Sequence, residues 1–325
     1  EEGAFLNTIG GDDGINDIFF SDSLQSISSD EIRHLNLSKV ENLNIYAITN
    51  LGRILDTTLI TSVSVSGTVN TIPESGFAGM TSLSEVNINE GVEKIGNKAF
   101  INCNSLPSIT IPKSVKEIAH SAFAFCSQLT DVSFSPSSTI SKIGDNAFES
   151  CDNLVNFDMS NANSLTDLGK GVFKNCTSLQ SINFTATKVG YFQEEVFKNC
   201  SSLTSVSFTN DNVVHFFDKE SFANTAISTF NIPKYTAGHD AFHPDAFKDC
   251  NNLVAFADPE TNFSYTVVSG ILYSCASDTN RTPISLIRFP NSKDGEATIL
   301  GTSISRAAFK HAGKVSKVIM DHQIT

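Results

Sequence analysis

Cysteines recur along this chain at a nearly constant interval, and that interval constrains the fold more than any other feature. Six of them are separated by 23, 25, 25, 24 and 50 residues, the last interval being two periods. Each lies three residues after a phenylalanine and three before a leucine. A fixed period of this size is typical of a solenoid, in which each unit buries its apolar face only by stacking on its neighbours. The six are Cys103, Cys126, Cys151, Cys176, Cys200 and Cys250.

Each repeat also contains the pattern of a half-buried strand. In the segment 83–88 a leucine and two spacers precede Val86 and Ile88, which flank one polar residue. This alternation predicts a strand with its apolar residues facing inward. A further apolar residue follows seven to nine positions later, often with a glycine after it, as in Ile95-Gly96, which fits a tight bend. The segment Ala-Phe-x-x-Cys then predicts one short helical or 3₁₀ turn.

The strand pattern predicts about twelve coils of 23–25 residues. Before the cysteines, the earliest such pattern is Ile32, Leu35 and Leu37. After them the pattern continues twice, in the three inward residues Ile284, Ile287 and Phe289 and in a final set of Val315, Val318 and Met320. The expected strand starts are 32, 60, 83, 106, 129, 154, 179, 203, 227, 253, 284 and 315.

Three segments depart from the repeat. Residues 1–31 are rich in glycine, serine and aspartate and predict an N-terminal cap or leader, so that residues 32–325 form a single solenoid. Residues 257–283 are too long for a plain turn, and the apolar run within them predicts an inserted hairpin that projects from the stack. Residues 290–300 contain Pro290, Asn291 and Gly295 and predict a loop.

The phenylalanines in register should form a continuous column of buried rings. The cysteines beside them could be buried free thiols, or they could form disulfide bonds or bind zinc. Stacked side chains point in parallel, so their Cβ atoms lie too far apart for disulfides, and zinc needs ligands that converge on one point. We therefore expect buried free thiols that act as small apolar residues. The nine phenylalanines are 77, 100, 123, 148, 173, 197, 222, 247 and 309.

Charge and hydropathy exclude several kinds of partner. The chain has 22 Lys and Arg against 35 Asp and Glu, a net charge of −13, which disfavours nucleic acid and anionic lipid surfaces. No stretch approaches the roughly 18 consecutive apolar residues of a membrane helix, so direct membrane insertion is not expected. The chain opens on Glu1-Glu2-Gly3 with no leader pattern, and we expect any secretion signal to have been removed or left out.

Possible metal sites are weak. His239 and His243 are four residues apart beside two aspartates, a spacing that on a helix would place both rings on one face. Pro244 makes a continuous helix improbable, so a surface loop with two histidines is the favoured interpretation. The run 12–17 lacks the spacing and the final glutamate of a calcium loop. No phosphate loop, nucleophile elbow or zinc-protease motif occurs, and we expect no cofactor and no enzyme activity.

The repeat Leu-x-x-Val-x-Ile/Phe…Ile-Gly-x-x-Ala-Phe-x-x-Cys-x-x-Leu closely resembles the leucine-rich repeat of the BspA-like, or treponemal-type, family. The segments 83–100 and 129–148 carry it most clearly, and the resemblance covers roughly residues 55–320. It implies a right-handed leucine-rich-repeat solenoid, an extracellular or bacterial cell-surface location, and binding of host proteins or other surface partners. Some relatives are adhesins.

The outward residues of the predicted strands form the candidate binding surface, because equivalent positions align on one face of a stack. This surface is polar and mildly acidic and contains no Trp, Tyr or Arg, the residues that usually dominate binding energy. It is equally what keeps a sheet soluble. The candidate binding residues are Glu85, Asn87, Asp131, Ser133, Asn156, Asp158, Asn183 and Asn231.

Two functions fit these observations. The first is a non-enzymatic, secreted or surface-anchored binding protein whose solenoid surface engages a macromolecule, most simply a protein and one that could belong to a host. The second is a structural spacer that holds another module away from the cell and has no ligand of its own. A contiguous patch of charged or apolar side chains would favour the first, and a featureless surface the second.

Overall fold

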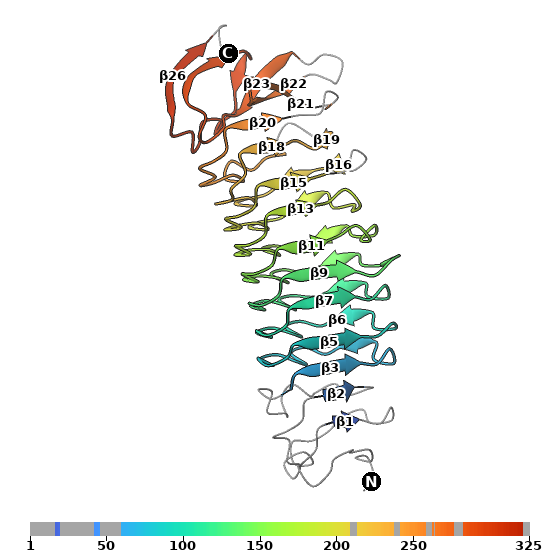
Figure 1. Cartoon of the computed structure of the whole chain (residues 1–325). Helices are drawn as coiled ribbons and strands as arrows, with labels where there is room; N and C mark the ends of the chain where they lie inside the picture. The colour runs from blue at the N-terminus through green and yellow to red at the C-terminus, as the bar shows by residue number, and fades with distance from the viewer. Residues whose placement is uncertain are drawn as a thin grey trace. The chain divides into compact units, whose positions relative to one another are not determined.

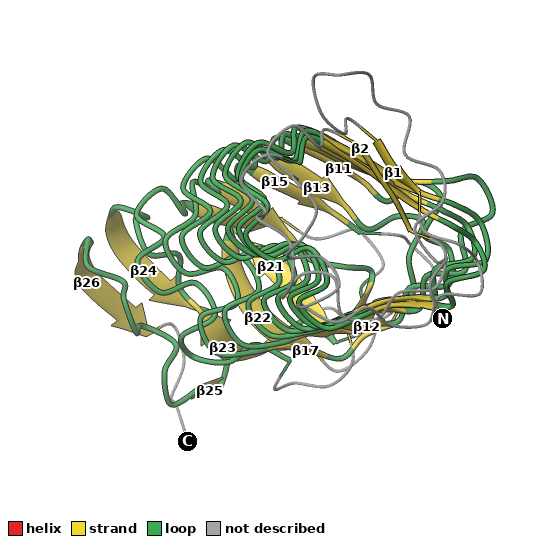
Figure 2. Cartoon of the chain, turned by 90° about the horizontal axis from the view of Figure 1, so that it is seen from below, coloured by secondary structure: helices red, strands yellow, loops and turns green. Residues whose placement is uncertain are grey.

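The structure is a computed structural model that describes residues 17–19, 42–45, 60–208, 213–236, 241–257, 262, 264–275 and 282–320. It consists of two compact units, Glu1–Leu165 and Thr166–Thr325, which we describe in turn. Throughout these described residues the chain forms strands and turns, and no helix occurs (Figure 2). The predicted β-rich solenoid of the leucine-rich-repeat type is therefore confirmed.

The long strands of the first unit are parallel, and each lies on the next (Figure 1). Paired residues such as Ser62 and Glu85, or Asp131 and Asn156, are 23 to 25 positions apart, so one coil advances the stack by one strand. These strands are β1 (Asp17–Phe19), β2 (Asn42–Ile45), β3 (Ser62–Val65), β5 (Glu85–Ile88), β7 (Ser108–Ile111), β9 (Asp131–Phe134) and β11 (Asn156–Asp158).

The strand paired with β3 is β2, in which Leu43 lies beside Val63. We predicted that Ile32, Leu35 and Leu37 supply the strand before β3, but residues 42–45 supply it instead. Residues 20–41 lie outside the described part of the chain. Of the predicted cap over 1–31 the structure describes only β1, which pairs with β2, and the cap stays a prediction.

A second row of two-residue strands closes the other side of each coil. Each buries its second residue, as Ile95 and Ile118 do, and turns its first outward. The outward residues pair by charge, with Lys94 Nζ 2.8 Å from the carboxylate of Glu117. In the first unit these short strands are β4 (Thr71–Ile72), β6 (Lys94–Ile95), β8 (Glu117–Ile118) and β10 (Lys142–Ile143).

The Ala-Phe-x-x-Cys segment is a series of turns and not the predicted helical turn. The backbone N–H groups of Lys98, Phe100 and Asn102 donate to carbonyls of the next coil at 2.7–2.9 Å. Only the intervening N–H groups bond within the coil, so half of the donors that a helix needs are used elsewhere. Lys98 and Asn102 also have φ of 55° and 61°, in the left-handed region that interrupts a helix.

Glycine after the inward isoleucine serves a close approach between coils and not the bend that we predicted. A Cβ atom at Gly96 would lie 2.4 Å from the carbonyl oxygen of Ile72, in the preceding coil. No other residue avoids this clash, and Gly96 is not among the residues with positive φ.

The repeated phenylalanines stack as predicted. In the first unit the rings of Phe77, Phe100, Phe123 and Phe148 follow one another at 5.0–5.3 Å between centroids. The interplanar angles are 17° or less, and all four side chains are buried. Such parallel rings add stacking energy to the burial of apolar surface.

All seven cysteines are buried and free, in agreement with the prediction for the six in register. Five of these thiols also donate to a specific partner, the carbonyl oxygen of the phenylalanine in the preceding coil. Cys126 Sγ donates to Phe100 O at 3.1 Å, and Cys200 Sγ donates to Phe173 O at 3.0 Å. Burial raises the pKa of Cys126 to about 12. The same bond joins Cys103, Cys151 and Cys250 to Phe77, Phe123 and Phe222.

The second unit continues with the same kinds of strand. The rings of Phe173, Phe197, Phe222 and Phe247 stack at 5.3–5.4 Å. The long strands are β13 (Ser181–Asn183), β15 (Ser205–Ser207), β18 (Thr229–Asn231) and β20 (Ala255–Ala257). The short strands are β12 (Asp167–Leu168), β14 (Tyr191–Phe192), β16 (Val213–Val214), β17 (Phe216–Phe217) and β19 (Tyr235–Thr236).

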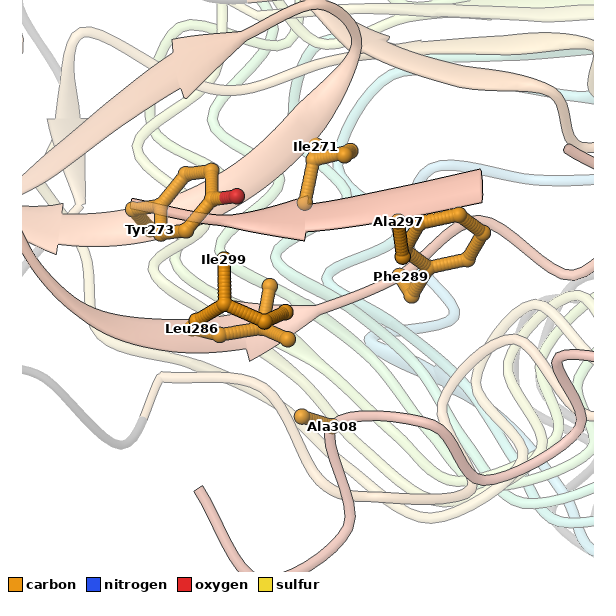
Figure 3. Packing of buried hydrophobic residues seen from close by; sticks show 7 residues of the cluster. All are labelled: Ile271, Tyr273, Leu286, Phe289, Ala297, Ile299 and Ala308. Carbon is orange, nitrogen blue, oxygen red and sulfur yellow. The ribbon is translucent and has the colours of Figure 1, made fainter. Parts of the chain in front are cut away.

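An antiparallel hairpin follows these coils, formed by β21 (Tyr265–Val268) and β22 (Ile271–Cys275). It does not project from the stack as we predicted, because every residue of β22 is buried. Tyr265 is also fully buried, and its hydroxyl oxygen accepts a hydrogen bond from the backbone N–H of Ala241. The hairpin packs in a cluster with Leu286, Phe289 and Ile299 (Figure 3).

The next strand, β23 (Pro283–Arg288), pairs antiparallel with β22 and turns Leu286 and Arg288 inward. The prediction that Ile284 and Ile287 face inward was wrong, since Ile284 is 40% exposed. A register shift of one residue exchanges the two faces of a strand. Phe309, which we placed in the main column of rings, stacks on Phe289 at 5.5 Å instead.

The predicted loop at 290–300 contains a strand, β24 (Gly295–Ile299), in which Ala297 and Ile299 are buried. The loop prediction was wrong because it gave weight to turn residues and missed this alternation. β24 pairs with β26 (Val315–Met320), where a strand was expected, although Val318 and Met320 are 44% and 60% exposed. The short β25 (Ser303–Ile304) pairs with β23.

Replacing a ring of the column should be far more damaging than replacing an exposed ring beside it. We expect Phe123→Ala to lower the free energy of unfolding by about 3–5 kcal/mol, as measured by urea denaturation. The control is Phe125→Asn, since Phe125 is 44% exposed and has a φ of 62° that asparagine adopts more readily. A similar loss in both variants would contradict a buried column.

The thiols should be inert until the chain unfolds. We expect no reaction of the native protein with a disulfide reagent at about pH 8, because all seven cysteines are buried and burial raises the pKa of Cys103, Cys126, Cys200 and Cys250. In denaturant and without reductant, all seven should react. A count below seven in denaturant would indicate disulfides and contradict the free-thiol ladder.

Candidate functional site

The predicted binding residues lie on the outward face of the long strands. We call this face the strand-face ribbon. In the first unit it contains six of them, all exposed apart from the half-buried Ser133, namely Glu85, Asn87, Asp131, Ser133, Asn156 and Asp158. Asn183 and Asn231 are exposed on the corresponding face of the second unit. Each unit thus aligns its own share of the ribbon.

Much of the hydrogen-bonding capacity of the ribbon is used internally. Thr130 Oγ1 and Asn156 Nδ2 donate to Asp131 at 2.6 and 2.7 Å, and these two bonds lower the pKa of the aspartate. Asp158 and Asn183 accept from backbone N–H groups of the turns that follow them, at 2.9 Å each. These side chains stabilise neighbouring coils and turns, which leaves the ribbon with few strong contacts to offer a partner.

The histidine pair is only partly described. His239 lies outside the described residues, whereas His243 is half-buried and its Nδ1 accepts a hydrogen bond from Asp245 N at 3.0 Å. Within the described part of the chain, no three His, Cys, Asp or Glu side chains lie together in a way that could hold a metal ion.

A ladder of ion pairs follows the turn segments of the second unit. Lys174 and Lys198 approach the carboxylate of Glu195 at 2.7 and 2.6 Å, and Lys198 and Lys248 approach that of Glu220 at 2.6 and 3.2 Å. The hydrogen bond from Lys198 is the main reason that the pKa of Glu220 is lowered. This row of acids is therefore neutralised by the protein itself.

Asp245 occupies the next position of this row, 25 residues after Glu220. Its carboxylate lies 2.7 Å from Lys310 Nζ and 2.9 Å from His311 Nε2. Burial alone would raise the pKa of Asp245, but the hydrogen bonds from these two side chains outweigh it and lower the pKa to about 2. Asp245 thus connects its own coil to the turn segment that contains Lys310 and His311.

Several short strands of the second unit present aromatic or apolar side chains outward, whereas β6, β8 and β10 of the first present charges. Tyr191 is 56% exposed, and its ring stacks on His215 at 5.0 Å. Tyr191 pairs in register with Phe216, and Val213, which is 44% exposed, pairs with Tyr235. We call the surface formed by these five residues the lateral aromatic face.

The outward residues of the long strands were the predicted binding surface, and this face on the short strands was not predicted. Aligning the repeats at the inward residue of each short strand would have found it. The residue before that position is Lys94, Glu117 or Lys142 in the first unit, and Tyr191 or Phe216 in the second. A change from charged to aromatic at an outward position is the signal that was available.

The repeat pattern of this chain identifies its family. It matches the pattern described as the BspA type leucine rich repeat region, in six copies over residues 53–161 and 135–254. The matched residues make up more than half of the 325 residues. The chain belongs to the BspA-type leucine-rich repeat family. The resemblance given by the Phe-x-x-Cys repeat is confirmed. Among curated proteins, no match to this chain is found.

Solved structures with the same repeat include three bacterial proteins. A leucine rich cell surface protein from Faecalibacterium prausnitzii is 24% identical, with a TM-score of 0.54 over 71% of this chain and 59% of its own. The T. pallidum leucine rich repeat protein is 24% identical, with a TM-score of 0.43, and the match covers 56% of this chain and 80% of that protein. A Bacteroides ovatus leucine-rich repeat protein is 18% identical, with a TM-score of 0.49, and the match covers 93% of this chain and 84% of that protein. This chain thus spans 59% of the first protein, and such identities establish the fold alone.

Across the described residues of this BspA-type chain, no helix has the length and apolar character needed to cross a membrane.

The ion pairs of Asp245 should make the stability of this BspA-type solenoid depend on pH. The pKa of Asp245 falls from 3.8 to about 2 on folding, so its contribution is complete above about pH 4 and is lost as the pH falls towards 2. We expect Asp245→Asn to lower the free energy of unfolding by roughly 2 kcal/mol at neutral pH. The difference from the parent chain should vanish near pH 2.

Asp294→Asn is the matched control for this prediction. The Asp294 side chain is 77% exposed and lies 3.8 Å from Lys314, so its removal should leave stability nearly unchanged. Urea denaturation at several pH values measures both variants. Parallel stability curves for Asp245→Asn and the parent chain between pH 4 and pH 2 would contradict the assigned role.

Proposed function

We propose that this chain is a non-enzymatic binding protein of a bacterial cell surface, and that a protein partner contacts the lateral aromatic face of its second unit. The observation that carries the proposal is the group of exposed Tyr191 on β14, Val213 on β16 and His215 between β16 and β17. Tyrosine is among the residues that contribute most to protein interfaces. Monomeric proteins seldom expose clustered apolar side chains that have no partner.

The geometry of the face favours binding for a second reason. The ring of Tyr191 is held against His215 at an interplanar angle of 16°, and Lys234 Nζ lies 5.0 Å from the centre of the Tyr235 ring. Side chains that are ordered before binding lose less conformational entropy on association. The face therefore offers aromatic contact area at a low entropic cost.

The strand-face ribbon is a weaker candidate for the same role. Its aspartates and asparagines already bond to neighbouring coils and turns, as Asp131 does with Asn156. A partner on the ribbon would have to compete with those bonds. The ribbon residues, Glu85 and Asn87 among them, contribute polarity and charge, and high salt should screen any effect of that charge on binding.

The cell-surface location is part of the proposal and rests on family membership. The F. prausnitzii protein with the same fold is described as a leucine rich cell surface protein. The net charge of −13 fits a solvated, extracellular surface that does not bind nucleic acid.

The test is a screen of this chain against immobilised extracellular-matrix and plasma proteins at low and high salt. For any partner found, we expect Tyr191→Ser to weaken binding about tenfold or more, because a central aromatic contact is lost. The interaction should persist in high salt, since apolar contacts are not screened. Each variant should keep the urea midpoint of the parent chain.

Two controls make the result specific. Phe125→Ser removes an aromatic side chain that is 44% exposed from the first unit and should leave binding unchanged. The pair Asp131→Asn and Asp158→Asn alters only the ribbon and should have a small effect that disappears in high salt. If the ribbon variants abolish binding and Tyr191→Ser does not, the ribbon is the contact surface. If no partner binds, the spacer hypothesis replaces this one.

A further inference from the structure

The second unit contains a pocket that shares one residue, Phe216, with the lateral aromatic face. Its volume is about 350 Å³, near the lower end of the range for small-molecule sites. Phe242, Phe247 and Ile287 form much of its apolar wall, and Phe216 joins it to the lateral aromatic face. The polar part of its lining is basic, with His243, Ser305, Arg288 and Arg306.

Arg288 is the unusual residue of this pocket. Its side chain is only 4% exposed, because β23 turns it inward although the repeat pattern would place a polar, outward residue there. Nη1 donates to the carbonyl oxygen of Pro244 and Nη2 to Asn291 Oδ1, whereas Nε has no hydrogen-bond partner among the described residues. Burial lowers the pKa of Arg288 to about 10, so the guanidinium stays charged at neutral pH.

The protein does not neutralise this charge. Among the described residues no carboxylate lies within ion-pair distance of Arg288. Asp245 is the acid whose negative charge raises the pKa of Arg288, but its carboxylate already pairs with Lys310 and His311. Arg306 adds an exposed positive charge at the same pocket. A chain with a net charge of −13 thus concentrates cations at one apolar hollow.

A buried, incompletely paired charge destabilises a fold, and replacing it by an apolar residue is often neutral or stabilising. Retaining such a charge is understandable where a ligand completes it. Arg288 is also rigidly placed, since β23 pairs with β22 on one side and with β25 on the other. The cluster shown in Figure 3, with Leu286 and Phe289, packs against the same strand.

We propose that this pocket binds a small organic anion with a flat apolar body, of the aryl carboxylate class. The carboxylate is held by the positive charges of Arg288 and Arg306, both of which line the pocket. The ring lies against the phenylalanines and Ile287, and a body of this kind suits the volume. The proposal does not depend on the protein partner, because it concerns a separate cavity and a separate class of ligand.

The experiment titrates the full chain with benzoate, benzamide and acetate, by calorimetry and by ligand-observed NMR. Benzoate should bind at least about tenfold more tightly than either of the others, because only benzoate supplies both the charge and the ring. Equal binding of benzoate and benzamide would overturn the proposal. So would the absence of saturable benzoate binding up to about 10 mM, the weak limit for a molecule of that size.

Three variants locate the site. Ala307→Leu fills the pocket without changing its charge and should abolish benzoate binding. Arg306→Gln should weaken benzoate binding but leave benzamide binding unchanged. Lys170→Gln removes the same charge from an exposed side chain of the second unit and is the control, expected to have no effect. Unchanged benzoate binding in Ala307→Leu would overturn the assignment to this pocket.

Arg288→Met supplies an independent readout. It should abolish the preference for benzoate over benzamide while leaving the urea midpoint of the unliganded protein equal or higher, since a buried charge is replaced by an apolar chain. Unchanged benzoate binding in Arg288→Met would overturn the proposal. If this variant fails to fold, the comparison of Ala307→Leu and Arg306→Gln with Lys170→Gln decides the matter.

Discussion

The hydrogen bonds between one coil and the next are the interaction on which the other features of this structure depend. In each turn segment the backbone N–H groups divide alternately between their own coil and the next, as Phe100 N donates to Ala122 O at 2.7 Å. The carbonyl oxygen of Phe100 in turn accepts from Cys103 N and from Cys126 Sγ. A coil without its neighbour would leave these buried polar groups unsatisfied.

This bonding explains why cysteine and glycine recur in the repeat. A thiol is small and apolar enough for the interior, yet it donates a weak hydrogen bond to a carbonyl that has a second lone pair available. Glycine at the position of Gly96 lets two backbones approach so closely that a Cβ atom would clash. The cysteines and Gly96 therefore follow from the contact between coils and carry no information about a ligand.

The outward positions are under no such constraint, and the surfaces of the molecule differ there. Short strands of the first unit pair charges such as Lys94 and Glu117, whereas those of the second expose Tyr191 and Val213. The long strands carry small polar side chains that bond to one another. Any recognition surface of such a fold must be sought among outward residues that depart from the local pattern.

The repeat made most of this fold predictable from the amino-acid sequence alone. The period, the inward residues of the long strands and the column of phenylalanines follow from spacing, because one apolar position per turn is enough to define a coil. Tertiary structure decided the rest. The face that β23 buries depends on its antiparallel partner β22, and the ring on which Phe309 stacks depends on the same strand. Arg288 lines a pocket only because segments between residues 216 and 307 that are distant in sequence come together there. A local sequence pattern does not predict such long-range contacts.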